Sequence, residues 1–439
     1  MGFLVSQAYD YNQFVRAVRS YTNGFPQLKK TNAMLPFDGI VVTGTGAGEL
    51  YTASNTGCVA GVSPGTAYRL TCTLGGGAGV AKFTMKRDPA GANVTIGAVS
   101  GVTADVRFRD ATYGEVIVRT TTNWVIGDQI NWSMIDTLLG SQKWVEDRFT
   151  EDVSPDGNGN FTTEWISHGP GLGGGLSIHG IMNTTFDNAN DRFFVALRSC
   201  DSYASGSVTL AQPNISPVVF IHLRKSSPMP FWLCVNGDRL VGACKAAGVY
   251  EWFHIGYLSI FGTPGNHPRP VFVGGTSTRG NIGTSDTDTG HRAFFSPGLH
   301  SAGATGEGAC FRWVDGTWYR GFYNYDASGA QGGSGKTGAI IPYGSTGSDS
   351  GAASIGDWNG FMQKVVAALG TGNYQLLPVT LVFKTTPQNA IVGDFQGIKA
   401  ISGNSQASEN LVTIGGDTYI VLQDTFRTSR AAYAALKLE

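Results

Sequence analysis

The stretch Phe231-Trp-Leu-Cys-Val-Asn-Gly-Asp-Arg-Leu-Val-Gly-Ala-Cys244 decides the class of fold. Two apolar runs, 231–235 and 239–244, flank an Asn-Gly dipeptide, which is typical of the tight turn of a β-hairpin. A long aromatic run from Tyr250 to Phe261 follows, and Pro264 then breaks it. The stretch therefore predicts a hairpin and a third, aromatic strand after it.

Short strands and turns are predicted along most of the remaining chain. Glycine contributes 62 of the 439 residues, and glycine weakens helix interiors and serves turns. Further strands are expected at 66–73, 80–85, 105–109, 115–119, 192–197, 218–222, 377–383, 397–401, 411–414 and 418–422.

Only two helices are expected. The first runs from Tyr9 to Tyr21, with Phe14, Val15 and Val18 at helical spacing and Asp10 as its cap. The second covers residues 357–369. We therefore predict a mainly β fold of several antiparallel β-sandwich-like domains with two short helices.

The length exceeds what one ordinary core supports and indicates several domains. We expect an N-terminal helix and linker at 1–37, a small β-sandwich module at 38–120 and a central β domain at 121–275. Glycine-rich loops and a C-terminal β/helix region at 276–439 would pack on the central domain. The segment 326–351 is expected to be loop-like. No internal repeat is present, which argues against a fibre shaft built from short repeated strands.

Charge and hydropathy exclude several partners. Charged residues make up 14% of the chain and the net charge is −1, without the basic block that nucleic-acid binding requires. No window approaches the ~18 apolar residues of a membrane span. The first 13 residues lack the pattern of a signal peptide. We expect no nucleic acid, no membrane insertion and synthesis in a cytoplasm.

The six cysteines are expected to be buried free thiols, because no CxxC pair occurs and a reducing cytoplasm disfavours disulfides. The alternative is one disulfide, either Cys58–Cys72 or Cys234–Cys244.

The motifs that carry chemistry are absent or incomplete. The phosphate-loop-like run 332–337 lacks the required earlier glycine, because residue 330 is Ala. Residues 156–160 alternate oxygen ligands as a calcium loop does, but a polar turn is preferred. No histidine pair has metal-binding spacing, and His222 and His254 are expected in the core. We predict no enzyme, no catalytic, cofactor-binding or metal-binding residue, and no cofactor.

Two groups leave alternatives open. The aromatic residues Trp232, Trp252 and Tyr257 are candidate ligand or interface residues, although strand aromatics also fill cores. A group of carboxylates leaves glycoside hydrolysis open against the default of surface acids. Its members are Glu146, Asp147, Glu151, Asp152 and Glu164.

Several segments together resemble uncharacterised virion structural proteins of tailed bacteriophages. They are Tyr9-Asp-Tyr11 with Phe14 and Val18, 124–128, 231–239, 257–275 and 393–419. The resemblance implies a tail or baseplate component of the virion that assembles with other virion proteins and as a homo-oligomer, with no catalytic residues. A host-surface (glycan or protein) binding tail protein is the alternative, and a polysaccharide-degrading tail enzyme is a third.

Overall fold

The computed structural model describes the following parts of the chain. They are residues 2–8, 10–23, 27–30, 42–43, 48–52, 67–74, 82–87, 94–100, 105–110, 114–120, 126, 129–135, 143–152, 156–170, 178–187, 192–225, 227–246, 248–259, 269–276, 309–313, 315–320, 337–341, 376–385, 388–401, 407–423 and 433–438.

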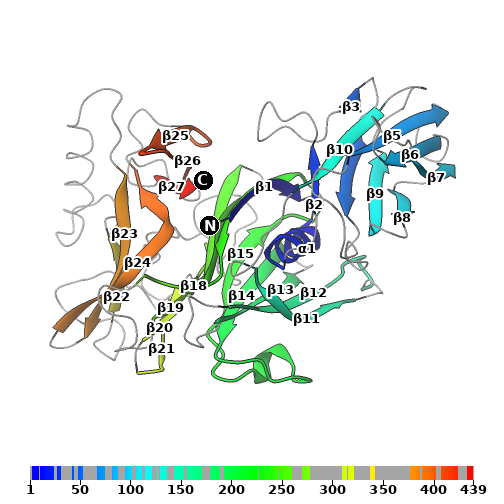
Figure 1. Cartoon of the computed structure of the whole chain (residues 1–439). Coiled ribbons are helices and arrows are strands. Elements are labelled where there is room, and N and C mark those ends of the chain that lie inside the picture. The colour runs from blue at the N-terminus through cyan, green and yellow to red at the C-terminus, as the bar shows by residue number, and fades with distance from the viewer. Residues whose placement is uncertain are drawn as a thin grey trace. The chain divides into compact units, whose positions relative to one another are not determined.

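The chain divides into two compact units (Figure 1). Unit 1 contains Met1–Leu4, Tyr9–Val15 and Ser141–Glu439, and unit 2 contains Val5–Ala8 and Arg16–Gly140. The expected division into four parts stays a prediction.

The described residues of unit 2 form two antiparallel sheets. The larger has the order β2-β10-β5-β6-β7, with β3 also paired to β10. Its strands are β2 (Gln27–Lys30), β3 (Val42–Thr43), β5 (Ala67–Leu74), β6 (Lys82–Arg87), β7 (Val94–Ser100) and β10 (Gln129–Ile135). The smaller has the order β4-β9-β8, with β4 (Gly48–Thr52), β8 (Asp105–Asp110) and β9 (Gly114–Thr120).

The described residues of unit 1 form three sheets, apart from the end of one strand, residues 5–8, which belongs to unit 2. The five-stranded sheet has the order β11-β12-β13-β14-β15, which is also the chain order, so each strand pairs with the next. Its strands are β11 (Val145–Glu151), β12 (Thr163–Gly169), β13 (Ile178–Asp187), β14 (Arg192–Cys200) and β15 (Val219–Leu223). A short 3-10 helix, Thr209–Ala211, lies between β14 and β15 in the chain.

The seven-stranded sheet has the order β1-β16-β17-β18-β19-β20-β21. Its strands are β1 (Gly2–Ala8), β16 (Met229–Asn236), β17 (Arg239–Ala246), β18 (Val249–Tyr257), β19 (Val271–Gly274), β20 (Ala309–Arg312) and β21 (Trp318–Arg320). Strands β16 and β17 form the hairpin predicted from the sequence, in which Asn236 pairs with Arg239.

The six-stranded sheet is C-terminal and has the order β22-β23-β24-β27-β26-β25. Its strands are β22 (Thr337–Ile341), β23 (Leu377–Thr385), β24 (Gln388–Ala400), β25 (Leu411–Ile414), β26 (Asp417–Gln423) and β27 (Tyr433–Lys437). Strand β22 lies inside the segment 326–351 that was expected to be loop-like, so that expectation was wrong for residues 337–341. The strand forms because β23 offers it a five-residue antiparallel partner.

The seven-stranded sheet packs on both of its faces, which explains its composition. On one face, Ile255 of β18 lies against Gly180 of β13 in the five-stranded sheet. On the other face, Trp252 of β18 donates its indole N–H to the carbonyl oxygen of Gln423 in β26, at 3.0 Å. All nine residues of β18 are buried. A strand covered on both faces needs a continuous rather than an alternating apolar run, and the run from Tyr250 has that pattern.

The first helix is confirmed. Helix α1 spans Tyr11–Thr22, and the side chain of Asp10 accepts a hydrogen bond from the backbone N–H of Gln13 at 2.6 Å, which is a standard helix cap. Phe14 is fully buried and lies edge-on to Phe231 and Phe253. The N-terminal half of α1 therefore covers part of the same sheet face as Ile255.

A buried ion-pair group lies at the turn of the β16–β17 hairpin. Asp238 accepts two hydrogen bonds from Arg239, at 2.8 and 2.9 Å, and one from Arg269 at 2.9 Å. Asp238 and Arg239 are 0% and 1% exposed. Because two guanidinium groups surround the carboxylate, its burial is compensated.

The mainly β class is confirmed by these sheets. The second expected helix, at 357–369, lies outside the described residues. Within the described parts of the chain, no helix has the length and apolar character needed to cross a membrane.

Candidate functional site

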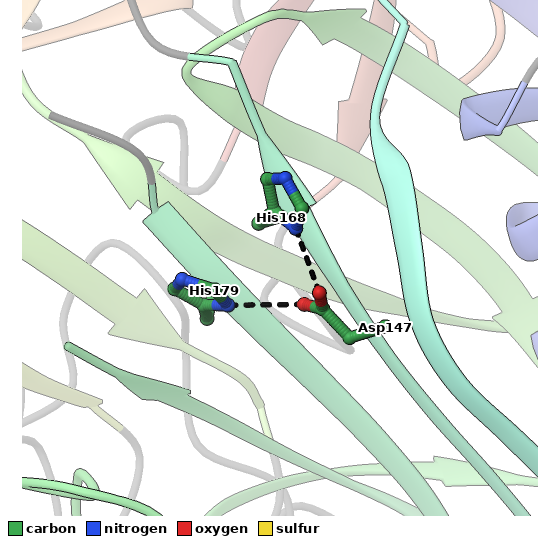
Figure 2. A group of neighbouring side chains, drawn as sticks. All are labelled: Asp147, His168 and His179. Carbon is green, nitrogen blue, oxygen red and sulfur yellow. Dashed lines mark hydrogen bonds and ion pairs between the residues drawn. The ribbon is translucent and has the colours of Figure 1, made fainter. Parts of the chain in front are cut away.

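Three side chains from neighbouring strands of the five-stranded sheet converge on one point (Figure 2). The carboxylate of Asp147 lies between two imidazoles, with Oδ1 2.8 Å from Nδ1 of His168 and Oδ2 3.0 Å from Nδ1 of His179. The two rings are tilted against each other, with centroids 5.1 Å apart. One ligand-type atom from each residue falls within 4.8 Å of the other two.

The strand register places the two histidines together. His168 of β12 pairs directly with His179 of β13, and residues directly opposite on antiparallel strands lie on the same face of the sheet. Val145 of β11 and Cys200 of β14 continue this row on either side.

A bulge in the edge strand brings the carboxylate to the histidines. The pairing of β11 with β12 shifts between Glu146 and Arg148, so Asp147 has no partner of its own in the ladder. A bulged residue is turned away from the regular alternation, and bulges commonly re-aim a side chain. Figure 2 shows Asp147 pointing toward both imidazoles.

The cluster lies at the border between core and solvent. The side chains of His179 and Asp147 are 9% and 11% exposed, and that of His168 is 27% exposed. A small apolar cluster that includes Ile166, Ile181 and Cys200 belongs to the same sheet. Burial, and then the negative charge of Asp147, raise the pKa of the Cys200 thiol to about 12. The thiol therefore stays protonated at neutral pH.

This donor set suits two kinds of chemistry. Imidazole nitrogen and carboxylate oxygen are ligands of zinc and of other divalent transition metals. Without an ion, the same atoms form a hydrogen-bonded His–Asp–His group, in which each ring donates from Nδ1 to the carboxylate.

Neither a scan against protein-family models nor a search of the curated proteins finds a match to this chain.

The three candidate aromatic residues are buried in the seven-stranded sheet. Trp232 and Trp252 are both 0% exposed and Tyr257 is 7% exposed. Trp252 is held by Gln423, while the guanidinium of Arg269 lies over the ring of Tyr257 at 5.0 Å from its centroid. Their burial favours the core interpretation over a sugar-binding platform.

Three carboxylates of the acidic group have different partners. Asp147 is bound to the two histidines, and Glu164 pairs with Arg148 at 2.8 Å. Asp152 is exposed and accepts a hydrogen bond from Thr162. These contacts give Asp147, Glu164 and Asp152 three different partners.

The calcium-loop-like residues 156–160 form a polar turn. The side chain of Asp156 accepts hydrogen bonds from the backbone N–H groups of Asn158 and Asn160, at 2.9 and 2.8 Å. Gly159 has a φ of +75°, which favours glycine. The carboxylate oxygens are used by the turn itself, as an Asx turn predicts.

Four cysteines are confirmed as buried free thiols: Cys200, Cys234, Cys244 and Cys310. The alternative disulfide Cys234–Cys244 is wrong, because Cys234 pairs with Val241 whereas Cys244 pairs with Phe231. The two thiols therefore point to opposite faces of the hairpin. The alternative Cys58–Cys72 lies outside the described residues, since residue 58 is not among them.

The cluster of Asp147, His168 and His179 was not predicted from the sequence. Histidine pairs with metal-binding spacing are two or four residues apart, whereas these two are eleven positions apart on separate strands. One signal was present: several glycines between residues 169 and 175 separate the two histidines, and such a run favours a chain reversal that would bring them together.

Proposed function

We propose that this chain is a structural component of a bacteriophage virion, in the tail or baseplate, that acts through protein–protein assembly. It would be made in the host cytoplasm and would assemble as a homo-oligomer and with other virion proteins. The resemblance of segments along the chain to tailed-phage virion proteins motivates the proposal. One structural observation, the apolar edge strand β25, supports it.

Strand β25 ends the six-stranded sheet and carries apolar side chains toward solvent. Leu411 is 52% exposed and Ile414 is 37% exposed, while Val412 between them is buried. On one side β25 pairs with β26, and no described strand pairs with its other side. An edge strand of this kind offers unpaired backbone groups and apolar surface to a strand of another chain.

The low charge of the chain agrees with assembly. Only 14% of the residues are charged, against about a quarter in an ordinary soluble domain. Interfaces between subunits are depleted in charged residues, so a chain with a large share of its surface covered by partners needs fewer of them.

The test compares the purified wild-type chain with two variants of β25 and one control variant. Light scattering after size-exclusion chromatography gives the oligomeric state, and mass spectrometry of purified phage particles shows whether the chain is present. We expect an oligomer that the Leu411→Ser and Ile414→Ser changes weaken. Leu210→Ser serves as the matched control, because Leu210 is 71% exposed and lies on the 3-10 helix rather than on β25.

A monomer that is absent from purified particles would end the proposal. An oligomer that all three variants weaken equally would keep the assembly role and remove β25 from it.

The two other functions gain no support from the geometry. A glycan-binding role based on Trp232, Trp252 and Tyr257 needs exposed rings, and these three are buried. A polysaccharide-degrading role needs two facing carboxylates, and Asp147 and Glu164 are each committed to basic partners. We therefore put neither forward.

A further inference from the structure

We propose that Asp147, His168 and His179 bind a divalent transition-metal ion of the zinc type, which ties the edge strand β11 to β12 and β13. The site is independent of the virion proposal, since it rests only on the five-stranded sheet. The geometry of the three side chains carries it.

The spacing of the donor atoms fits a small ion. A tetrahedral zinc ion with bonds of about 2.0–2.1 Å holds its ligand atoms about 3.3 Å apart. The two distances from Asp147 to the imidazole nitrogens are 2.8 and 3.0 Å. These two distances run to different oxygens of the carboxylate, and one donor atom of each residue lies within 4.8 Å of the other two. Rotations of the three side chains would bring the donors to the tetrahedral spacing.

The chemical types of the donors select the metal class. Two imidazole nitrogens and one carboxylate oxygen suit zinc and its neighbours in the first transition row, whereas calcium and magnesium prefer sites built from oxygen alone. Cys200 lies opposite His179 in the ladder, but its Sγ is not among the donor atoms that lie within 4.8 Å of one another. Three protein ligands leave one coordination position for water.

The strands hold the ligands in place before any ion arrives. The two histidines are directly opposite on paired strands, and the bulge at Asp147 aims the carboxylate at both rings. Ligands fixed on strands bind a metal with less loss of conformational freedom than ligands on loops. The partly exposed ring of His168 gives an ion access from solvent.

The location gives the ion a structural role. Strand β11 is the end strand of its sheet and is mostly half-exposed, and among the described strands it forms a ladder with β12 alone. An ion held by Asp147 of β11, His168 of β12 and His179 of β13 would link three strands at one point. Because the ion binds the folded chain and not the unfolded chain, it would raise the unfolding temperature.

The experiment uses the untagged full-length chain, freed of metal with a chelator, and Zn²⁺ alone as the probe. Isothermal titration calorimetry is expected to show one high-affinity Zn²⁺ per chain, and Zn²⁺ is expected to raise the unfolding temperature. Asp147→Asn and His179→Gln are each expected to weaken binding more than about tenfold, since even changes to residues behind the ligands commonly have that effect.

Asp152→Asn is the matched control, because it makes the same chemical change directly after β11, away from the histidines. It is expected to leave the affinity unchanged. His168→Gln provides a milder variant in case the changes at the more buried positions prevent folding, which circular dichroism of the metal-free proteins would reveal. Co²⁺ adds a spectroscopic signature, since its visible absorption reports nitrogen and oxygen ligands and should be lost in His168→Gln.

Two results would overturn the proposal. Absence of Zn²⁺ binding by the wild-type chain would leave a hydrogen-bonded His–Asp–His group. Equal binding by the wild type and by all three ligand variants would place the ion elsewhere in the chain.

Discussion

His254 makes the stability of unit 1 sensitive to acid. Its ring is fully buried on β18, and Nδ1 donates a hydrogen bond to the carbonyl oxygen of Phe272 at 3.1 Å. Phe272 and Phe395 lie edge-on to it, with ring centroids 5.5 and 5.4 Å away. Burial lowers the pKa of His254 from 6.5 to about 3, although the Phe272 carbonyl partly opposes this shift.

The direction of the pH effect follows from these two pKa values. In the folded chain the ring stays neutral down to about pH 3, whereas in the unfolded chain it takes up a proton below pH 6.5. Folding is therefore stabilised fully by the neutral ring above pH 6.5, and this stabilisation is lost as the pH falls toward 3. The nearby charges of Arg239 and Asp238 act in opposite directions and are smaller than the effect of burial.

The magnitude is large for a single side chain. Each pKa unit corresponds to about 1.4 kcal/mol, so acidification from about pH 6.5 to pH 4.5 should lower the free energy of unfolding by about 3 kcal/mol through this group alone. The full shift corresponds to about 5 kcal/mol. His254→Phe keeps an aromatic ring between Phe272 and Phe395 and removes the titrating group.

Urea denaturation followed by tryptophan fluorescence measures the effect, because Trp232 and Trp252 lie in the same sheet as His254. Between about pH 7 and pH 4.5, the wild type should lose about 3 kcal/mol more stability than His254→Phe. Other titrating groups are common to both proteins and cancel in the comparison. Parallel pH profiles for the two proteins would show that the buried ring of His254 does not make stability sensitive to acid.

Three further predictions concern packing, thiols and the buried ion pair. Gly180→Ala should lower stability by about 1–3 kcal/mol in urea denaturation, since its Cβ would lie 2.9 Å from the Trp144 ring. Gly157→Ala is the control and should leave stability unchanged, because a Cβ at this position has no atom within 4 Å. Equal losses of stability in the two variants would contradict the prediction. Mass spectrometry should find the four buried cysteines unalkylated in the native chain at about pH 8, because burial shields the thiols from the reagent. Burial also raises the pKa values of Cys200, Cys234 and Cys244, that of Cys234 to about 12, and alkylation needs the thiolate. Labelling as fast as in urea would contradict this prediction. Asp238→Ala should lower the free energy of unfolding by about 3–5 kcal/mol, because it leaves two guanidinium groups without their carboxylate. A loss of less than about 1 kcal/mol in urea denaturation would contradict this prediction.

The sequence predicted the elements whose signals are local. The β16–β17 hairpin has its turn residues and both apolar runs within 14 consecutive residues, 231–244. Helix α1 has its apolar spacing and its Asp10 cap in one short segment. In both cases the residues that determine the structure are neighbours in the chain, so no distant contact had to be known.

Strands that depend on distant partners were missed. Strand β13 has the sequence Ile-His-Gly-Ile-Met-Asn-Thr-Thr-Phe-Asp, in which glycine and polar residues interrupt the apolar pattern. It forms because β12 and β14 pair with it along most of its length. Strand β27, with two alanines, a leucine and a lysine, suits a helix by propensity, but it lies between β24 and β26.

The candidate site was beyond sequence reasoning for a similar reason. The contact between Asp147 and the two histidines depends on a bulge and on the pairing of three strands, neither of which a residue pattern specifies. The burial of Trp252 likewise depends on β26, which lies more than 150 residues later in the chain. Whether strand aromatics face a ligand or a second sheet is decided by that distant segment.

The proposed virion role is tested most directly by electron microscopy of phage particles labelled with a gold-conjugated antibody against this chain. If the chain is a tail or baseplate component, label is expected on the tail or at the baseplate of intact particles. Label on the head would contradict the tail assignment. An absence of label on particles, together with label only in the soluble fraction of the lysate, would contradict the structural role itself.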